Sequence, residues 1–212
     1  MKDFTVLMSL VDYIPVAIFA VAAVIFLRDF YNKMSKGAFA LFAAGEIDII
    51  VAGFIKATYK LLYALGVCDF EALSDAFFPM QSLGFLIAGI GMIALIFHKQ
   101  SKETTVAAVA PAVFKGTMVF VGMIILGLAF IYSGYCYVSK KLKKPAPIVL
   151  FVFSFICYLG MGYLSSRNFA EASMNWIAEG VNIIGSSSLL VGAVLLHKFG
   201  LSDLKLRDEN VA

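Results

Sequence analysis

Charged residues are scarce in this sequence. They make up 15% of it, whereas 61% of the residues are hydrophobic. Soluble domains carry about 25% charged and about 45–50% apolar residues, and here apolar runs recur along the whole chain. The sequence therefore predicts an integral membrane protein of the cell membrane, whose first partner is the lipid bilayer. Its net charge of +3 gives no case for nucleic-acid binding.

Residues that bind metals or act as nucleophiles are also few. The three cysteines form no Cys-x-x-Cys motif, and the two histidines, His98 and His197, each stand at the end of an apolar run. This supply argues against a disulfide framework, a zinc site and a haem-binding pair, so we expect no metal and no cofactor. Phosphate-binding loops, dinucleotide-binding glycine patterns and Gly-x-Ser-x-Gly motifs are absent from the sequence.

Long apolar segments are what the sequence does contain. Six of them are close to the roughly 20 residues that cross a bilayer core, namely 4–27, 37–55, 76–97, 114–138, 147–164 and 176–196. Residues 56–65 are expected to continue the second segment as a helix along the membrane interface. We therefore predict an all-α bundle of about six transmembrane helices in a single domain, with both termini on one side of the membrane.

The two halves of the sequence are weakly alike. Residues 33–38 parallel residues 141–146 at an offset of 108. At an offset of 101, the second half repeats an amide and two glycines of the first, pairing Gln81, Gly84 and Gly91 with Asn182, Gly185 and Gly192. This similarity predicts half-repeats 1–99 and 112–199. Since three spans is an odd number, directly joined halves are expected to be inverted, with a ligand site between them near the midplane.

Two carboxylates interrupt the second apolar segment. Glu46 and Asp48 stand near its centre, where each acid costs about 2.5–3.5 kcal/mol on insertion scales. Ionisable residues at membrane depth are functional candidates by default. Because the two acids are two residues apart, they point to nearly opposite faces of a regular helix. The alternative for each is a structural role, accepting hydrogen bonds from a neighbouring helix.

Polar residues form a stripe in the sixth segment. Asn175, Glu179, Asn182 and Ser186 are spaced four, three and four residues apart, so they share one helical face. Such a face contacts protein or water and not lipid. Gln81 is the repeat equivalent of Asn182, and both amides are expected near the centre of the bundle. The stripe predicts either a ligand or ion pathway or hydrogen bonding that only joins helices.

Asp12 is expected to play a lesser part than these residues. Pro15 follows it by three residues, as at a helix start, so Asp12 is predicted to be an exposed N-cap at the interface. The alternative is a full span from Phe4, with Asp12 buried and the helix broken at Pro15. Broken helices of that kind line binding sites in transporters.

We expect a small multi-pass membrane protein that binds or translocates a small solute or a cation. The predicted site comprises Glu46, Asp48, Gln81, Asn175, Glu179 and Asn182. A second hypothesis is a non-transporting module, either a sensor or a subunit that binds a partner or a second copy of itself. A third is an intramembrane enzyme that uses carboxylates alone. A cavity reaching Glu46 or Glu179 favours the first hypothesis, whereas direct hydrogen bonds to these groups favour the second.

Overall fold

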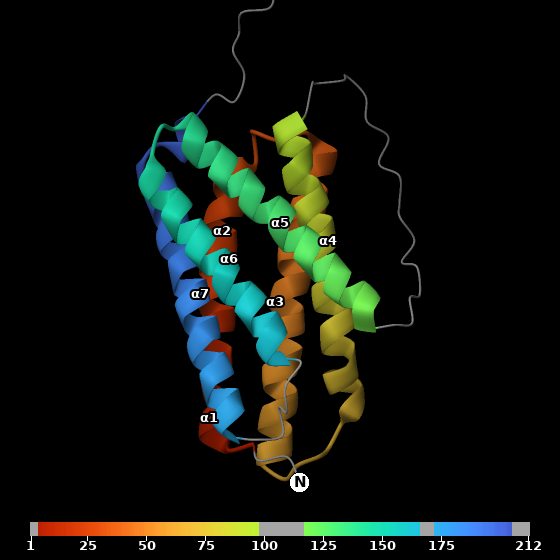
Figure 1. Ribbon diagram of the computed structural model, residues 1–212. Coiled ribbons are helices and arrows are strands. Elements are labelled where there is room, and N and C mark those ends of the chain that lie inside the picture. The colour runs from red at the N-terminus through yellow and green to blue at the C-terminus, as the bar shows by residue number, and fades with distance from the viewer. Residues whose placement is uncertain (1–3, 98–116, 166–171, 205–212) are drawn as a thin grey trace, which may run out of the picture.

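The computed structural model describes residues 4–97, 117–165 and 172–204, and every element in these ranges is helical (Figure 1). The helices are α1 (Val6–Val11), α2 (Tyr13–Phe30), α3 (Lys36–Ala64), α4 (Glu71–Phe97), α5 (Thr117–Lys141), α6 (Pro145–Ser165) and α7 (Ala172–Lys198), followed by a short 3-10 helix, η1 (Leu201–Asp203). Within the described ranges, six spans are long and apolar enough to cross a membrane, with α1 and α2 together forming the first. This confirms the predicted multi-pass helical bundle.

Helix α3 is longer than the sequence predicted. It begins at Ser35, whose side chain accepts a hydrogen bond from the Ala38 backbone N–H at 3.2 Å, and it ends before Gly66, whose φ of +66° suits glycine. Its 29 residues extend about 43 Å, beyond the roughly 30 Å of a bilayer core. The predicted continuation as a helix is present, and Lys60 in that part of α3 is buried inside the bundle.

Small residues set the helix directions within the first half. A Cβ placed on Gly45 of α3 would lie 2.5 Å from the Ala88 backbone of α4, and one on Gly91 would lie 2.7 Å from the Phe42 backbone. Residue numbers therefore rise along α3 as they fall along α4, and the two helices are antiparallel. Helix α2 is antiparallel to α3 as well, since Tyr13 hydrogen-bonds Thr58 at 2.9 Å.

The second half repeats these directions. Gly185 and Gly192 of α7 pack against Cys157 and Phe151 of α6, respectively, so α6 and α7 are antiparallel. The rings of Tyr135 in α5 and Phe151 in α6 lie 5.2 Å apart, and the Tyr132 hydroxyl lies 2.6 Å from Ser154 Oγ, so α5 and α6 are antiparallel.

The two halves contact each other through parallel helices. Along α4 and α5, the Phe78 ring meets the Phe120 ring at 5.9 Å, and Met92 meets Gly134 further on. Along α2 and α7, Asp29 meets His197 near the C-terminal end of both helices. The halves α2–α4 and α5–α7 thus run in the same direction. The colours in Figure 1, which follow the residue numbers, show the direction of each helix.

This arrangement differs from two sequence-based expectations. The inverted repeat is not supported, because it would require α5 to run opposite to α2. Helix α1 also lies at the bottom of Figure 1 whereas α7 ends at the top, which does not fit an expectation of both ends on one side; the two termini themselves lie outside the described residues. The parity argument assumed that α5 starts where α4 ends, whereas its packing places it alongside α4 in parallel. The proposed half-repeat boundaries at 99 and 112 lie outside the described residues.

An aromatic column fills one half of the bundle interior. It consists of Phe26, Phe30, Phe42, Tyr135 and Phe151, all of which are buried. Phe26 and Tyr135 stack at its centre with ring centroids 4.1 Å apart and an interplanar angle of 11°. Aromatic pairs of this kind contribute about 0.5–1.5 kcal/mol beyond the area that they bury. The column closes the interior towards the end of the bundle where α2, α5 and α7 finish.

Candidate functional site

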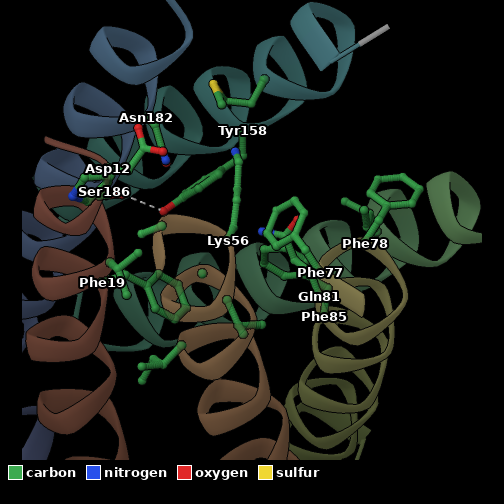
Figure 2. Close-up of a pocket in the computed structure, with 18 of the residues that line it drawn as sticks. Asp12, Phe19, Lys56, Phe77, Phe78, Gln81, Phe85, Tyr158, Asn182 and Ser186 are labelled. Atoms are coloured by element: carbon green, nitrogen blue, oxygen red, sulfur yellow. Dashed lines mark hydrogen bonds between the residues drawn. The ribbon is translucent and has the colours of Figure 1, made fainter. Parts of the chain in front are cut away.

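A cavity of about 130 Å³ occupies the other half of the bundle (Figure 2). It lies on the side where α1, α4 and α7 begin, and residues from all six spans line it. Its polar wall consists of Asp12, Lys56, Gln81, Glu179, Asn182 and Ser186. Its apolar wall includes Phe19, Ile49, Phe77, Phe78, Phe85 and Leu128. The site therefore combines a hydrophobic surface with a few convergent polar groups, as small-molecule sites usually do.

An ion cluster forms one side of this cavity, and Lys60 is at its centre. The Lys60 ammonium lies 2.6 Å from Asp12 Oδ2 and 3.7 Å from Glu179 Oε1, and it donates a hydrogen bond to Asn175 Oδ1 at 3.3 Å. The three charged side chains are at most 5% exposed. Three helical segments that are distant in sequence are thus joined through one buried ammonium.

Lys56 completes the ion cluster, which we define as Asp12, Lys56, Lys60 and Glu179. One turn before Lys60 on α3, it lies on the same helical face. Its ammonium is 4.9 Å from the centroid of the Phe77 ring, and its charge acts on both Glu179 and Asp12. The cluster therefore holds two acidic and two basic side chains.

Three carboxylate oxygens of the cluster lack hydrogen bonds among the described residues: both oxygens of Asp12, of which Oδ2 is ion-paired with Lys60, and Oε2 of Glu179. Among the described residues, neither Asp12 Oδ1 nor Glu179 Oε2 has a hydrogen-bond partner, although both side chains are more than nine-tenths buried. Both residues line the cavity. A buried acceptor without a donor costs about 1–3 kcal/mol, and more when it is charged. These oxygens are almost fully covered by protein, so the carboxylates line the cavity through their other atoms.

The predicted amides lie at the same cavity. Gln81 comes from α4 and Asn182 from α7, and Figure 2 shows them on different sides of the space that Lys56 reaches. Tyr158 also lines the cavity, and its hydroxyl lies 2.9 Å from Ser186 Oγ. Of the six residues predicted from the sequence, the structure places Gln81, Glu179 and Asn182 on the cavity wall and Asn175 beside it, bonded to Lys60.

Glu46 and Asp48 lie apart from this group. Glu46 is buried and accepts a hydrogen bond from the Tyr135 hydroxyl at 3.4 Å, beside the aromatic column. Glu46 is not among the residues that line the cavity, although Ile49, three residues later on α3, is. Asp48 is half-buried and is not part of the cavity wall. The contact of Glu46 is the kind expected of a structural group.

Asp12 differs from its expected role as an exposed cap, which was wrong. It is 4% exposed, and its side chain makes no capping hydrogen bond to α2. The helix is interrupted at Asp12 itself, between α1 and α2, three residues before Pro15. The alternative of a broken span with a buried carboxylate describes it better. The pairing with Lys60 explains why the acid is tolerated there.

The two lysines of the cluster were missed by the sequence analysis. They follow an apolar span and were assigned to the interface on that ground. A usable signal was present, because Lys56 and Lys60 are one helical turn apart and the chain carries unpaired acids at membrane depth. Which acids they meet depends on helix packing, which the sequence does not show.

Among the described residues there is no group of three or more His, Cys, Asp or Glu side chains that could hold a metal ion. His197 lies at the end of α7 beside Asp29, and His98 lies outside the described residues. Comparison of the chain with family models, curated proteins and solved structures finds no match.

Proposed function

We propose that this protein binds a small solute in the cavity between its two halves. The observation that carries the proposal is a cavity lined by residues from all six spans, whose wall combines charged and amide side chains with an apolar surface. Polar groups at membrane depth are costly, and ligand pathways are the usual reason for keeping them.

A solute fits the cavity better than an inorganic cation does. A cation site in a protein usually offers an excess of oxygen ligands and negative charge. Here Lys56 and Lys60 balance Asp12 and Glu179. The phenylalanine side chains of the apolar wall offer no oxygen ligands to a bare ion. They can instead pack against the carbon skeleton of a solute.

We infer an internal duplication of the two halves, which supports a site between them. The sequence offsets of 101 and 108 relate contacts as well as residues: Gly84 meets Ile49, and their equivalents Gly185 and Cys157 also meet. Because the halves run in the same direction, the duplication would be a parallel repeat, with its two-fold axis along the bundle.

A parallel repeat explains why the two amides share one cavity. Rotation about an axis along the bundle keeps equivalent residues at equal depth, so Gln81 and Asn182 would face the axis from opposite sides. The aromatic column blocks the interior beyond the cavity. Release of the solute to the opposite side would therefore require this column to repack. Binding in the cavity needs no such change, so binding is the first step to test.

A pair of glycines on α6 gives the test of this proposal. Gly162 lines the cavity and Gly160 does not, and a Cβ added at either position meets nothing within 4 Å. Gly162→Leu should therefore fill the cavity without disturbing the fold, and Gly160→Leu is its matched control. We expect a thermal-shift screen of small solutes in detergent to find stabilisers that act on the wild type and Gly160→Leu but not on Gly162→Leu. Solute binding in this cavity would be contradicted if the stabilisers acted equally on all three proteins, or if the screen found no stabiliser.

A further inference from the structure

We infer that the solute is a small planar ring that carries amide groups at its edge, the chemistry of a free pyrimidine base. The inference rests on the proposed function, because it assigns a ligand class to the same cavity. Three features carry it: two side-chain amides without partners in the cavity wall, the aromatic side chains in the rest of that wall, and the volume of the cavity.

Two side-chain amides in the cavity wall lack hydrogen-bond partners. Gln81 on α4 and Asn182 on α7 both line the cavity, and neither side chain makes a hydrogen bond to any other residue that the structure describes. Both residues are only partly buried, and Figure 2 shows them on different sides of the space. An unsatisfied amide at membrane depth is costly. These are therefore the groups whose hydrogen bonds a ligand would complete.

The remaining polar groups of the wall already have partners. The members of the ion cluster interact with one another, and the Tyr158 hydroxyl lies 2.9 Å from Ser186 Oγ. A ligand that bound to these groups would compete with an existing contact, whereas a ligand that binds the two amides breaks none. The amides therefore determine the polar chemistry of the ligand.

A side-chain amide recognises a matching edge on its ligand. It presents N–H donors and a C=O acceptor side by side. Its complement is a group with an adjacent acceptor and donor in one plane, and Asn and Gln read the edge of adenine through such a pair of hydrogen bonds. Because Gln81 and Asn182 reach the cavity from different helices, a ligand with two such edges can bind both. Uracil has this pattern, since each of its two ring N–H groups adjoins a carbonyl.

The aromatic side chains and the volume of the cavity favour a single flat ring. The aromatic residues of the wall are Phe19, Phe77, Phe78, Phe85 and Tyr158. Contacts between rings in stacked or edge-to-face arrangements contribute beyond the area that they bury. The cavity of about 130 Å³ is close to the roughly 150 Å³ of an engineered cavity that admits benzene. One six-membered ring therefore fits this space, whereas the same ring joined to a sugar exceeds it.

Uracil and two analogues of similar size test the inference. Pyrimidine is a flat ring without N–H donors or carbonyls, and dihydrouracil keeps both amide edges but has a puckered ring. Binding of each to the full-length wild-type protein is measured in detergent by calorimetric titration. We expect uracil to bind at least about tenfold more tightly than pyrimidine and at least about threefold more tightly than dihydrouracil. An analogue that binds as tightly as uracil, or uracil that does not bind, overturns the inference.

Two variants test the role of the amides directly. Gln81→Met and Asn182→Leu each remove an amide and keep a side chain of similar size, so each should reduce the preference for uracil over pyrimidine by about threefold or more. Ser188→Ala is the control, because Ser188 lies on α7 outside the cavity wall and bonds only within its own helix. An unchanged preference in both amide variants would contradict the inference. If either variant fails to fold, the wild-type comparison still decides the question.

The control at α6 separates this inference from the proposed function. If an analogue binds as tightly as uracil, and Gly162→Leu abolishes its binding while Gly160→Leu does not, the cavity is a solute site and only the inference of an amide-bearing ring fails. If none of the three compounds binds in a manner that Gly162→Leu abolishes, that inference fails as well. The proposed function then fails too if the broader solute screen also finds no stabiliser that Gly162→Leu excludes.

Discussion

At the scale of single residues, Lys60 determines whether the ion cluster is stable. Its ammonium contacts two carboxylates and an amide in the bundle interior, and its side chain is 5% exposed. A buried ion pair is weak evidence of net stabilisation, but removing one partner leaves the others uncompensated. The stability of this region should therefore depend on Lys60 more than on any surface lysine.

The first prediction is that Lys60→Met strongly destabilises the protein. Breaking a buried pair costs about 3–5 kcal/mol, whereas Lys140→Met, at an exposed position at the end of α5, should change stability by less than about 0.5 kcal/mol. The double variant Asp12→Asn with Lys60→Met should recover part of the loss, because it removes the charge that Lys60 compensates. Thermal unfolding in detergent measures all three. An equal loss for Lys60→Met and Lys140→Met would contradict the buried pairing.

The sequence predicted polar residues at the site better than it predicted their partners. Glu179, Asn182 and Gln81 could be selected because a polar stripe on a spanning helix must face protein or water. Asp12 was underrated because an acid near a proline resembles a cap, and only the neighbouring α3 shows that it is buried. The depth of Glu46 in its span could be read from the sequence, whereas its hydrogen bond to Tyr135 could not.

At the scale of helices, small residues control how closely the two halves approach. A Cβ on Gly127 of α5 would collide with the Phe85 backbone of α4, whereas one on Gly122 of the same helix meets nothing within 4 Å. Small residues at such contacts are a common device in membrane helix packing, because they allow backbones to come close. The parallel contact of α4 with α5 therefore depends on Gly127.

The second prediction compares these two glycines. Gly127→Ala should destabilise the protein by about 1–3 kcal/mol, as overpacking usually does. Gly122→Ala should be neutral or slightly stabilising, because alanine is the better helix former. Thermal unfolding of both variants in detergent checks the difference. If Gly122→Ala proved the more harmful change, the close contact between α4 and α5 would be wrong.

The positions of the helices were largely predictable, and their ends were not. Each of the six apolar segments became a span, because length and hydropathy decide insertion. Helix α4 begins at Glu71, ahead of the predicted residue 76, and keeps Pro79 inside. Helix α3 runs through two lysines to Ala64. In α3, neighbouring helices supply the partners of Lys60, a residue that hydropathy alone would exclude.

At the scale of the whole molecule, the direction of the second half decides where equivalent residues meet. The sequence similarity between the halves was readable, but its orientation was not, because the parity argument depended on how α4 and α5 are joined. The parallel contacts of α4 with α5 and of α2 with α7 place both halves in the same direction. That direction is what brings Gln81 and Asn182 to one cavity.

The direction of the halves can be measured by which membrane face each end of the bundle occupies. Cys68 is exposed in the turn between α3 and α4, at the end where α4 begins. Ser202 is exposed in η1, beyond the end of α7. Two single-thiol proteins suffice: one that keeps only Cys68, and one that lacks the native cysteines and carries Ser202→Cys. Labelling of intact cells with a membrane-impermeant maleimide should modify only one of the two, because they lie on opposite faces. Labelling of both, or of neither, before the cells are opened would contradict two parallel halves around a shared cavity.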